Sequence, residues 1–139
     1  MPRLARSALY VPGDASDKLT KALGRGADAV IVDLEDAVAP ADKPGARQAL
    51  LAWLDANPAQ AVVVRINAAG TDWHEDDLLA CRHAGVAGVM LPKADSAAQL
   101  RHARASSGKP VLAIIETAVG LDALREIAGA EGCARLVFG

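Results

Sequence analysis

The chain has 139 residues, of which 52% are hydrophobic and 23% are charged, and its formal net charge is −2. This composition suits one globular unit and gives no electrostatic reason to expect nucleic acid or an anionic membrane surface as a partner. Aromatic residues make up only 3% of the chain, so platforms for base stacking are not expected either.

The lack of a signal peptide and the small number of cysteines favour a reduced, cytoplasmic setting. The first six residues lack the apolar stretch of a signal peptide, and no uninterrupted apolar run is long enough to span a bilayer. Cys81 and Cys133 are the only cysteines, which is too few for a disulfide scaffold or a zinc site. We therefore expect a cytoplasmic protein that does not use a membrane.

Short apolar runs alternate with helical patterns along the whole chain, and each run ends in a polar or Gly/Pro cluster. The predicted strands are 8–11, 29–32, 62–64, 88–91, 111–115 and 136–138. Apolar residues spaced i, i+3, i+4 predict helices between them, beginning near 16, 42, 75, 96 and 121. Ser16 and Asp42 are plausible N-caps, and the fifth helix carries Leu121, Leu124 and Ile127.

Alternation of strands and helices predicts a parallel β/α architecture. A closed (β/α)8 TIM barrel takes about 250 residues, so residues 1–139 are expected to form the N-terminal portion of a single barrel domain, an incomplete barrel of about six units. An open doubly wound sheet is the alternative that fits this length. It usually carries a glycine-rich first turn, which Pro12-Gly13-Asp14 does not match.

Glu116 is the first candidate for chemistry because it ends the strongest apolar run. Working residues of β/α barrels lie at the carboxyl ends of the strands. A carboxylate there suits Mg²⁺, which takes one or two carboxylates and leaves places for water and substrate. The alternative is that Glu116 or Thr117 only caps the next helix.

Three carboxylates, Asp33, Glu35 and Asp36, follow the second predicted strand. On an extended segment Asp33 and Glu35 share one face and Asp36 points away. Such acids can support a metal or accept a proton with a raised pKa. A solvated acidic loop before a helix is the alternative.

Arg65 interrupts an apolar strand and is therefore expected to be paired. Its guanidinium suits carboxylates or an enolate oxygen derived from a thioester, and an internal salt bridge to one of the acids is the alternative. Lys93 is interpreted as structural or electrostatic, because neighbouring acids oppose the depressed pKa of a Schiff-base lysine. His74, His83 and His102 are interpreted as surface or hydrogen-bonded histidines rather than ligands.

An ordered series of motifs runs from end to end of the chain, at 6–13, 18–22, 33–38, 43–47, 64–67, 77–78, 91–93, 115–121 and 138–139. In this order and spacing the series resembles the citrate lyase β-subunit-like group of the HpcH/HpaI aldolase and citryl/malyl-CoA lyase superfamily. The resemblance implies a Mg²⁺-dependent lyase. It would break or form a carbon–carbon bond in a 3-hydroxyacyl-CoA such as citryl-, malyl- or citramalyl-CoA, with a 2-keto acid as the second product.

The resemblance also implies roles for individual residues. Glu116 would bind the metal directly and lie beside the keto acid, and Arg65 would bind the substrate and stabilise the enolate of acetyl-CoA. Glu35 and Asp36 would lie near the metal-bound waters and the substrate as catalytic residues.

The early basic residues Arg6, Lys18 and Lys21 would meet the phosphates of coenzyme A by the same resemblance. The family's second metal carboxylate follows the Phe-Gly pair that stands here at 138–139, so a chain ending at this pair would lack one ligand and have little or no lyase activity. A late segment of family members closes a neighbouring subunit's site, which implies a homo-oligomer, a trimer or a hexamer.

Two other functions remain open at this stage. A CoA-independent pyruvate aldolase of the same superfamily would carry an acidic-Glu-His signature near the second strand, whereas Glu35 is followed here by Asp36. The other is a truncated, non-catalytic module that binds coenzyme A or pairs with a partner through its alanine-rich helices.

Overall fold

Six parallel strands form one sheet in which the strand order follows the chain order, β1-β2-β3-β4-β5-β6. The computed structural model describes residues 5–139. A doubly wound sheet reverses its strand order at a switch point, so sequential order excludes that alternative. The expected α/β fold, an incomplete TIM barrel of six strands, is confirmed. The strands are β1 Ala8–Pro12, β2 Ala29–Asp33, β3 Val62–Arg65, β4 Val86–Leu91, β5 Val111–Ile115 and β6 Cys133–Phe138.

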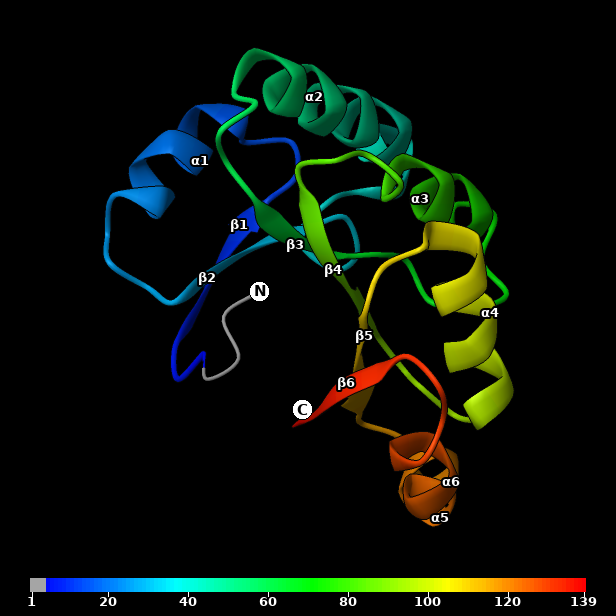
Figure 1. Cartoon of the computed structure of the whole chain (residues 1–139). Coiled ribbons are helices and arrows are strands. Elements are labelled where there is room, and N and C mark those ends of the chain that lie inside the picture. The colour runs from blue at the N-terminus through cyan, green and yellow to red at the C-terminus, as the bar shows by residue number, and fades with distance from the viewer. Residues whose placement is uncertain (1–4) are drawn as a thin grey trace.

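The helices cover the outer side of the curled sheet, and its inner side faces the open space near the chain's C-terminal end (Figure 1). Ser96 caps α4 as a serine N-cap should, with Oγ accepting from the Gln99 N–H at 3.3 Å. Asp42 is the N-cap of α2 but makes no side-chain cap bond. The helices are α1 Ser16–Leu23, a 3₁₀ turn at Pro40–Asp42, α2 Lys43–Ala56, α3 His74–Ala80, α4 Ala97–Ser107, α5 Ala118–Asp122 and α6 Leu124–Ala128.

The fifth predicted helix is wrong as one element, because the chain breaks at Ala123 into α5 and α6. Ala123 has a φ of −85° and a ψ of 9°, outside the helical range. The apolar spacing continues across the break because Leu124 and Ile127 pack against the same core. The helical spacing of these apolar residues therefore comes from their packing against the core and not from one continuous helix.

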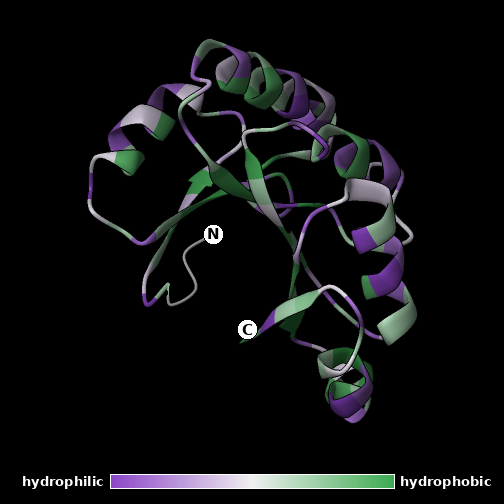
Figure 2. Ribbon diagram, viewed as in Figure 1, coloured by the Kyte–Doolittle hydropathy of each residue, from purple (hydrophilic) through white to green (hydrophobic). Residues whose placement is uncertain are grey.

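Two apolar layers lie on either side of the sheet, whose strands are the most hydrophobic part of the ribbon (Figure 2). The larger layer fills the space between helices and strands, with fully buried Leu50, Leu54 and Leu78. The smaller layer lines the inner side and consists of Ile31, Val63, Met90, Leu112 and Ile114. A cavity of about 300 Å³ opens against this inner layer.

Strand register carries two charged residues onto the inner side. Ile31 pairs with Val63, and both belong to the inner layer. Because side chains alternate along a strand, Asp33 and Arg65, two residues further on, face the same way and are themselves register partners. Both end their strands, so they lie at the carboxyl-terminal rim. Among residues 5–139, no helix is long and apolar enough to cross a membrane.

Candidate active site at the carboxyl ends of the strands

Asp33 and Arg65 form a two-pronged ion pair at this rim. Arg65 Nε donates to Asp33 Oδ1 at 2.8 Å and Nη2 donates to Oδ2 at 2.6 Å. Burial raises the pKa of the Asp33 carboxyl, but hydrogen bonds from Arg65 and two backbone N–H groups outweigh it and hold the pKa below its usual range. The bond to Asp33 raises the pKa of Arg65. The salt-bridge alternative for Arg65 is thus present, with Asp33 as its partner.

The acidic segment after β2 is a turn rather than an extended strand. The N–H groups of Glu35 and Ala37 donate to the two oxygens of Asp33 at 2.9 and 3.0 Å. The buried ammonium of Lys43, from α2, donates to the carbonyl oxygens of Leu34 and Glu35 at 2.9 and 2.6 Å. These bonds fold the segment back on itself, so Glu35 is buried while Asp36 is exposed.

Glu35, Lys93 and Glu116 continue the polar network from β2 across to β5. Lys93 Nζ donates to Glu35 Oε1 at 2.5 Å, and the backbone N–H of Lys93 donates to Glu116 Oε1 at 2.8 Å. The bond to Glu35 raises the pKa of Lys93, which opposes a free-amine nucleophile. Glu35 Oε2 lies 3.5 Å from Arg65 Nη1. Arg65 and Glu116 therefore belong to one rim, connected through two side chains.

Lys93 reaches both carboxylates from a backbone conformation that L-residues rarely adopt. Its φ is 47°, the only positive φ at a non-glycine position among residues 5–139. Such a conformation costs of order 1–3 kcal/mol and persists where the surroundings enforce it. The Ala94 N–H donates to the Ile114 carbonyl at 3.1 Å, which ties this loop to β5.

The turn that follows Glu116 is fastened to the same loop. Thr117 Oγ1 donates to Asp95 and accepts from the Gly120 N–H at 2.9 Å. A Cβ on Gly120 would stand 2.3 Å from the Ala94 carbonyl oxygen, so α5 approaches the loop as closely as glycine allows. Thr117 is thus the cap of α5, and Glu116 is left for other contacts.

The donor set fits a hard divalent cation. Glu116 is exposed, and only Oε1 is engaged in a hydrogen bond among the described residues, so Oε2 remains as an oxygen ligand. Glu35 Oε2 is buried without a hydrogen bond in the same part of the chain. A buried polar atom without a hydrogen bond is costly, and the group that this oxygen faces is the Arg65 guanidinium, whose Nη1 lies 3.5 Å away. Mg²⁺ needs one or two carboxylates with water and substrate completing its shell, which these residues can provide.

The predicted coenzyme A residues are not brought together. Arg6 precedes β1 and bonds through its backbone N–H to Asp28 at 2.7 Å, at the amino end of the strands. Lys18 and Lys21 are exposed on α1, which follows the carboxyl end of β1. Among the described residues no hydrogen bond or ion pair joins Arg6 to either lysine, and Arg6 contacts Asp28 instead. The phosphate role of the three residues stays a prediction.

Tyr10 is a residue of the site that the sequence reasoning missed. Its ring lies 5.0 Å from the Arg65 guanidinium, and its hydroxyl donates to Met90 Sδ at 3.1 Å. A cation over an aromatic face is attracted electrostatically, so Tyr10 is a second contact that holds Arg65, in addition to Asp33. The sequence shows only that Tyr10 alternates with Pro12 along the first strand; its place beside Arg65 follows from the register in which Pro12 pairs with Asp33, which the sequence does not contain.

Comparison with known proteins shows which family the chain belongs to. The family profile described as HpcH/HpaI aldolase/citrate lyase matches residues 6–139. A citrate lyase subunit beta-like protein of Mycobacterium tuberculosis is 42% identical over 132 residues, covering 94% of this chain and 46% of that protein. A (3S)-malyl-CoA thioesterase of Cereibacter sphaeroides is 38% identical over 137 residues, covering 96% and 48%.

A solved structure is similar over almost the whole chain. It is protein CitE from Mycobacterium tuberculosis in complex with magnesium, acetoacetate and coenzyme A, with a TM-score of 0.82 and 43% identity over 99% of this chain and 49% of that one. The chain spans about half the length of the curated relatives it matches. The resemblance carried by the motifs is confirmed: the chain belongs to the HpcH/HpaI aldolase/citrate lyase family.

Proposed function

We propose that the protein is a Mg²⁺-dependent carbon–carbon lyase for a 3-hydroxyacyl-CoA of the citryl-, malyl- or citramalyl-CoA type. The observation that carries this proposal is the shared rim of Glu116 and Arg65, connected through Lys93 and Glu35. On this proposal Glu116 supplies an oxygen ligand and Arg65 a fixed cation from the same side of the sheet. The magnesium and coenzyme A bound by the similar mycobacterial protein support the same chemistry.

Cleavage leaves the electrons of one carbon–carbon bond on the acyl-CoA fragment. The bond between the α- and β-carbons breaks, the β-hydroxyl gives its proton to a base as the keto acid carbonyl forms, and negative charge develops on the thioester oxygen as an enolate. Protonation of the enolate at its α-carbon then gives the acyl-CoA product. A preorganised cation aimed at the thioester oxygen lowers the barrier. Arg65 supplies it: Nε and Nη2 are held by Asp33, so Nη1, which lies 3.5 Å from Glu35 Oε2, is the group proposed to face the substrate.

Glu35 and Asp36 are the carboxylates proposed to manage the proton. Glu35 Oε2 has no hydrogen bond among the described residues, and Asp36 is exposed within the electrostatic reach of Lys93. A general base must lie within hydrogen-bond reach of the proton it takes, and the buried Glu35 is the better fixed of the two. Lys93 holds Glu35 in place through its ammonium.

Glu116 is proposed to hold the metal and to border the keto acid. A bound Mg²⁺ supplies Lewis-acid polarisation of the keto acid's oxygens. Lys18 and Lys21, exposed on α1, and Arg6 are the proposed contacts of the coenzyme A phosphates. Phosphates bind lysine as a point charge, so these contacts should weaken with added salt.

The test compares Glu116→Gln with Glu126→Gln, an exposed glutamate on α6 away from the rim. Mn²⁺ binding followed by electron paramagnetic resonance, and Mg²⁺-dependent release of keto acid from malyl-, citramalyl- and citryl-CoA, should both be lost in Glu116→Gln and kept in Glu126→Gln. Equal metal binding by the two variants would remove Glu116 from the metal site. No keto acid from any substrate with the metal bound would refute the lyase reaction.

Hydrolysis of the thioester is the second candidate, favoured by the 38% identity to a (3S)-malyl-CoA thioesterase. Cleavage of malyl-CoA gives acetyl-CoA and glyoxylate, whereas hydrolysis consumes water and gives malate and free coenzyme A. A thiol reagent detects the free coenzyme A of hydrolysis directly, and a carbonyl reagent detects the glyoxylate. A pyruvate aldolase would instead work without coenzyme A, and a non-catalytic module would bind it without turnover.

We further propose a cytoplasmic homo-oligomer, a trimer or hexamer. Val119, Leu121 and Phe138 are exposed large apolar residues next to Glu116, at 61%, 59% and 65% exposure. Apolar side chains gathered in this way commonly mark a contact surface. Sedimentation analysis of the purified chain decides between a single species of three or six subunits and a monomer.

A further inference from the structure

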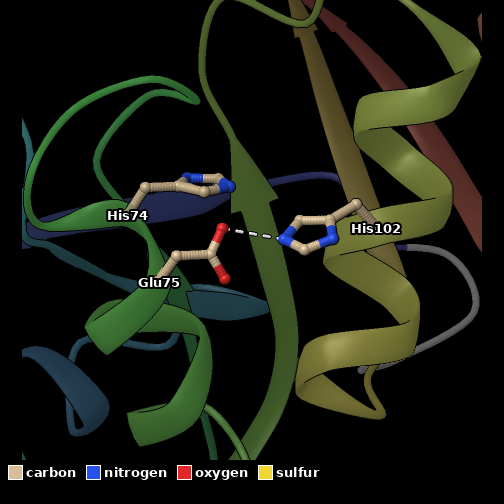
Figure 3. Close-up of side chains that lie close together, drawn as sticks. All are labelled: His74, Glu75 and His102. Atoms are coloured by element: carbon tan, nitrogen blue, oxygen red, sulfur yellow. Dashed lines mark hydrogen bonds and ion pairs between the residues drawn. The ribbon is translucent and has the colours of Figure 1, made fainter.

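His74, Glu75 and His102 bring three ligating atoms together on the outer side of the sheet. One atom from each residue lies within 4.8 Å of the other two. Figure 3 shows the carboxylate of Glu75 directed at His102, with the edge of the His74 ring facing the space between them. His102 Nε2 and Glu75 Oε1 are 2.8 Å apart. The residues come from α3 and α4, and only the first two are neighbours in sequence.

His74 is held as a metal-binding histidine is usually held. It is buried, and its Nδ1 lies 2.8 Å from the Asn67 carbonyl oxygen. A carbonyl only accepts, so Nδ1 must carry the ring proton, and in the neutral ring Nε2 keeps its lone pair. No hydrogen bond to Nε2 is found within residues 5–139. Metal-bound histidines typically donate their second nitrogen to a carbonyl or carboxylate, which fixes ring and tautomer.

The Asn67 carbonyl that orients His74 is itself fixed. The backbone N–H of Asn67 donates to Asp77 Oδ2 at 2.9 Å, and its side-chain amide donates to the same oxygen at 2.7 Å. Arg47 Nε donates to the other oxygen of Asp77 at 2.8 Å. The His74 ring therefore rests on a buried network, whereas the other two side chains are half-exposed and can adjust.

We propose that His74, Glu75 and His102 form a binding site for a borderline divalent transition-metal ion of the Zn²⁺ type. Two imidazoles and one carboxylate suit zinc, nickel, copper or ferrous iron, whereas magnesium prefers oxygen ligands alone. Bonds of about 2.0–2.1 Å in a tetrahedral shell place ligand atoms about 3.3 Å apart. The three atoms lie within 4.8 Å of one another, and Glu75 and His102 are already 2.8 Å apart, so rotations of these two exposed side chains can bring all three to that separation.

The site is distinct from the rim and would act on the fold rather than on the reaction. It cross-links α3 to α4, the helices that follow β3 and β4. The carboxylate and imidazole left exposed keep solvent access, so water completes the shell. The competing explanation is that Glu75 and His102 form only a surface ion pair, which is of little energetic value and leaves the His74 lone pair unused.

The test is Zn²⁺ binding by the whole chain, measured by equilibrium dialysis with the metal alone and in excess Mg²⁺. One Zn²⁺ per chain is expected, not displaced by Mg²⁺. His102→Ala and Glu75→Gln should weaken it by well over the roughly tenfold that loss of an outer partner costs. The matched control is His83→Ala, whose histidine bonds Asp55 outside the cluster. Both exposed ligand positions can be changed without disturbing the buried network.

The visible absorption of bound Co²⁺ reports on the ligands of the metal and not on folding alone. Co²⁺ bound by the wild-type chain should show visible bands of a four- or five-coordinate site, absent in His102→Ala and kept in His83→Ala. Glu116→Gln should leave these bands unchanged, which separates this site from the proposed magnesium site. Absence of Zn²⁺ binding, or equal loss in His102→Ala and His83→Ala, would overturn the proposal.

Discussion

Replacing Asp33 by asparagine should destabilise the folded chain by about 3 kcal/mol. The substitution keeps the shape but removes the charge that faces Arg65, and asparagine can accept at only one of the two oxygen positions. Four donors converge there, two from Arg65 and the N–H groups of Glu35 and Ala37. Breaking a buried charge pair by removing one partner costs roughly 3–5 kcal/mol.

That range must be reduced for this site. The Arg65 side chain keeps 16% exposure, against 3% for Asp33, so water partly compensates the guanidinium. Glu35 Oε2 stands 3.5 Å from Arg65 Nη1 and can close on it. We therefore expect about 2–4 kcal/mol, a loss of at least roughly thirtyfold in the folding equilibrium at 25 °C.

Urea unfolding followed by circular dichroism measures this loss, with Asp36→Asn as the matched control. Asp36 is an exposed acid three residues away, and its variant should stay within about 0.5 kcal/mol of wild type. Arg65→Met and the double variant complete a cycle whose coupling should be about 1–3 kcal/mol. A difference of under about 0.5 kcal/mol between Asp33→Asn and wild type would refute the reasoning.

Three further outcomes follow from the same contacts. The pKa of Asp33 is lower in the folded chain than in the unfolded chain, where it is near 3.9. Its contribution to stability is therefore present above pH 3.9 and is lost as the pH falls through the folded-state pKa. Below pH 4 the urea midpoint should drop more steeply in wild type than in Asp33→Asn. Gly120→Ala should lower the melting temperature, because its Cβ would meet the Ala94 oxygen at 2.3 Å. Gly45→Ala in α2 has open space around it and should stabilise the fold by about 0.5–1 kcal/mol. A higher melting temperature for Gly120→Ala than for Gly45→Ala would contradict this. Burial raises the pKa of Cys81 to about 12, so alkylation at pH 8 should reach Cys81 only in urea. Peptide mapping separates it from the partly exposed Cys133, and rapid labelling of Cys81 itself in the native chain would disprove its burial.

The strands and their rim were predictable because the signal is local. A run such as 111–115 is apolar at every position, which is typical of a strand covered on both faces, and Glu116 breaks it with a charge. Parallel strands then bring such charges to one edge without further information. The prediction that Glu116 and Arg65 lie at the same edge needed only two rules: a charge marks the end of an apolar strand, and parallel strands end at one edge.

The pairing of particular side chains needed register and packing, which local patterns do not contain. Arg65 could have met any nearby acid, and the pairing of β2 with β3 selects Asp33. His74 and His102 looked scattered because their proximity depends on how α3 packs on α4. The 6.2 Å between their ring centroids is a property of the tertiary fold alone.

The left-handed backbone at Lys93 has a consequence for engineering. Glycine relaxes that conformation, which other L-residues adopt at a cost of about 1–2 kcal/mol, so a design guided by backbone preference alone would place glycine there. The same change would delete the ammonium that stands among Glu35, Asp36 and Glu116 and leave three anions to repel one another. Backbone preference and the charge balance of the rim thus favour different residues at this position, and stabilising libraries should leave this lysine untouched.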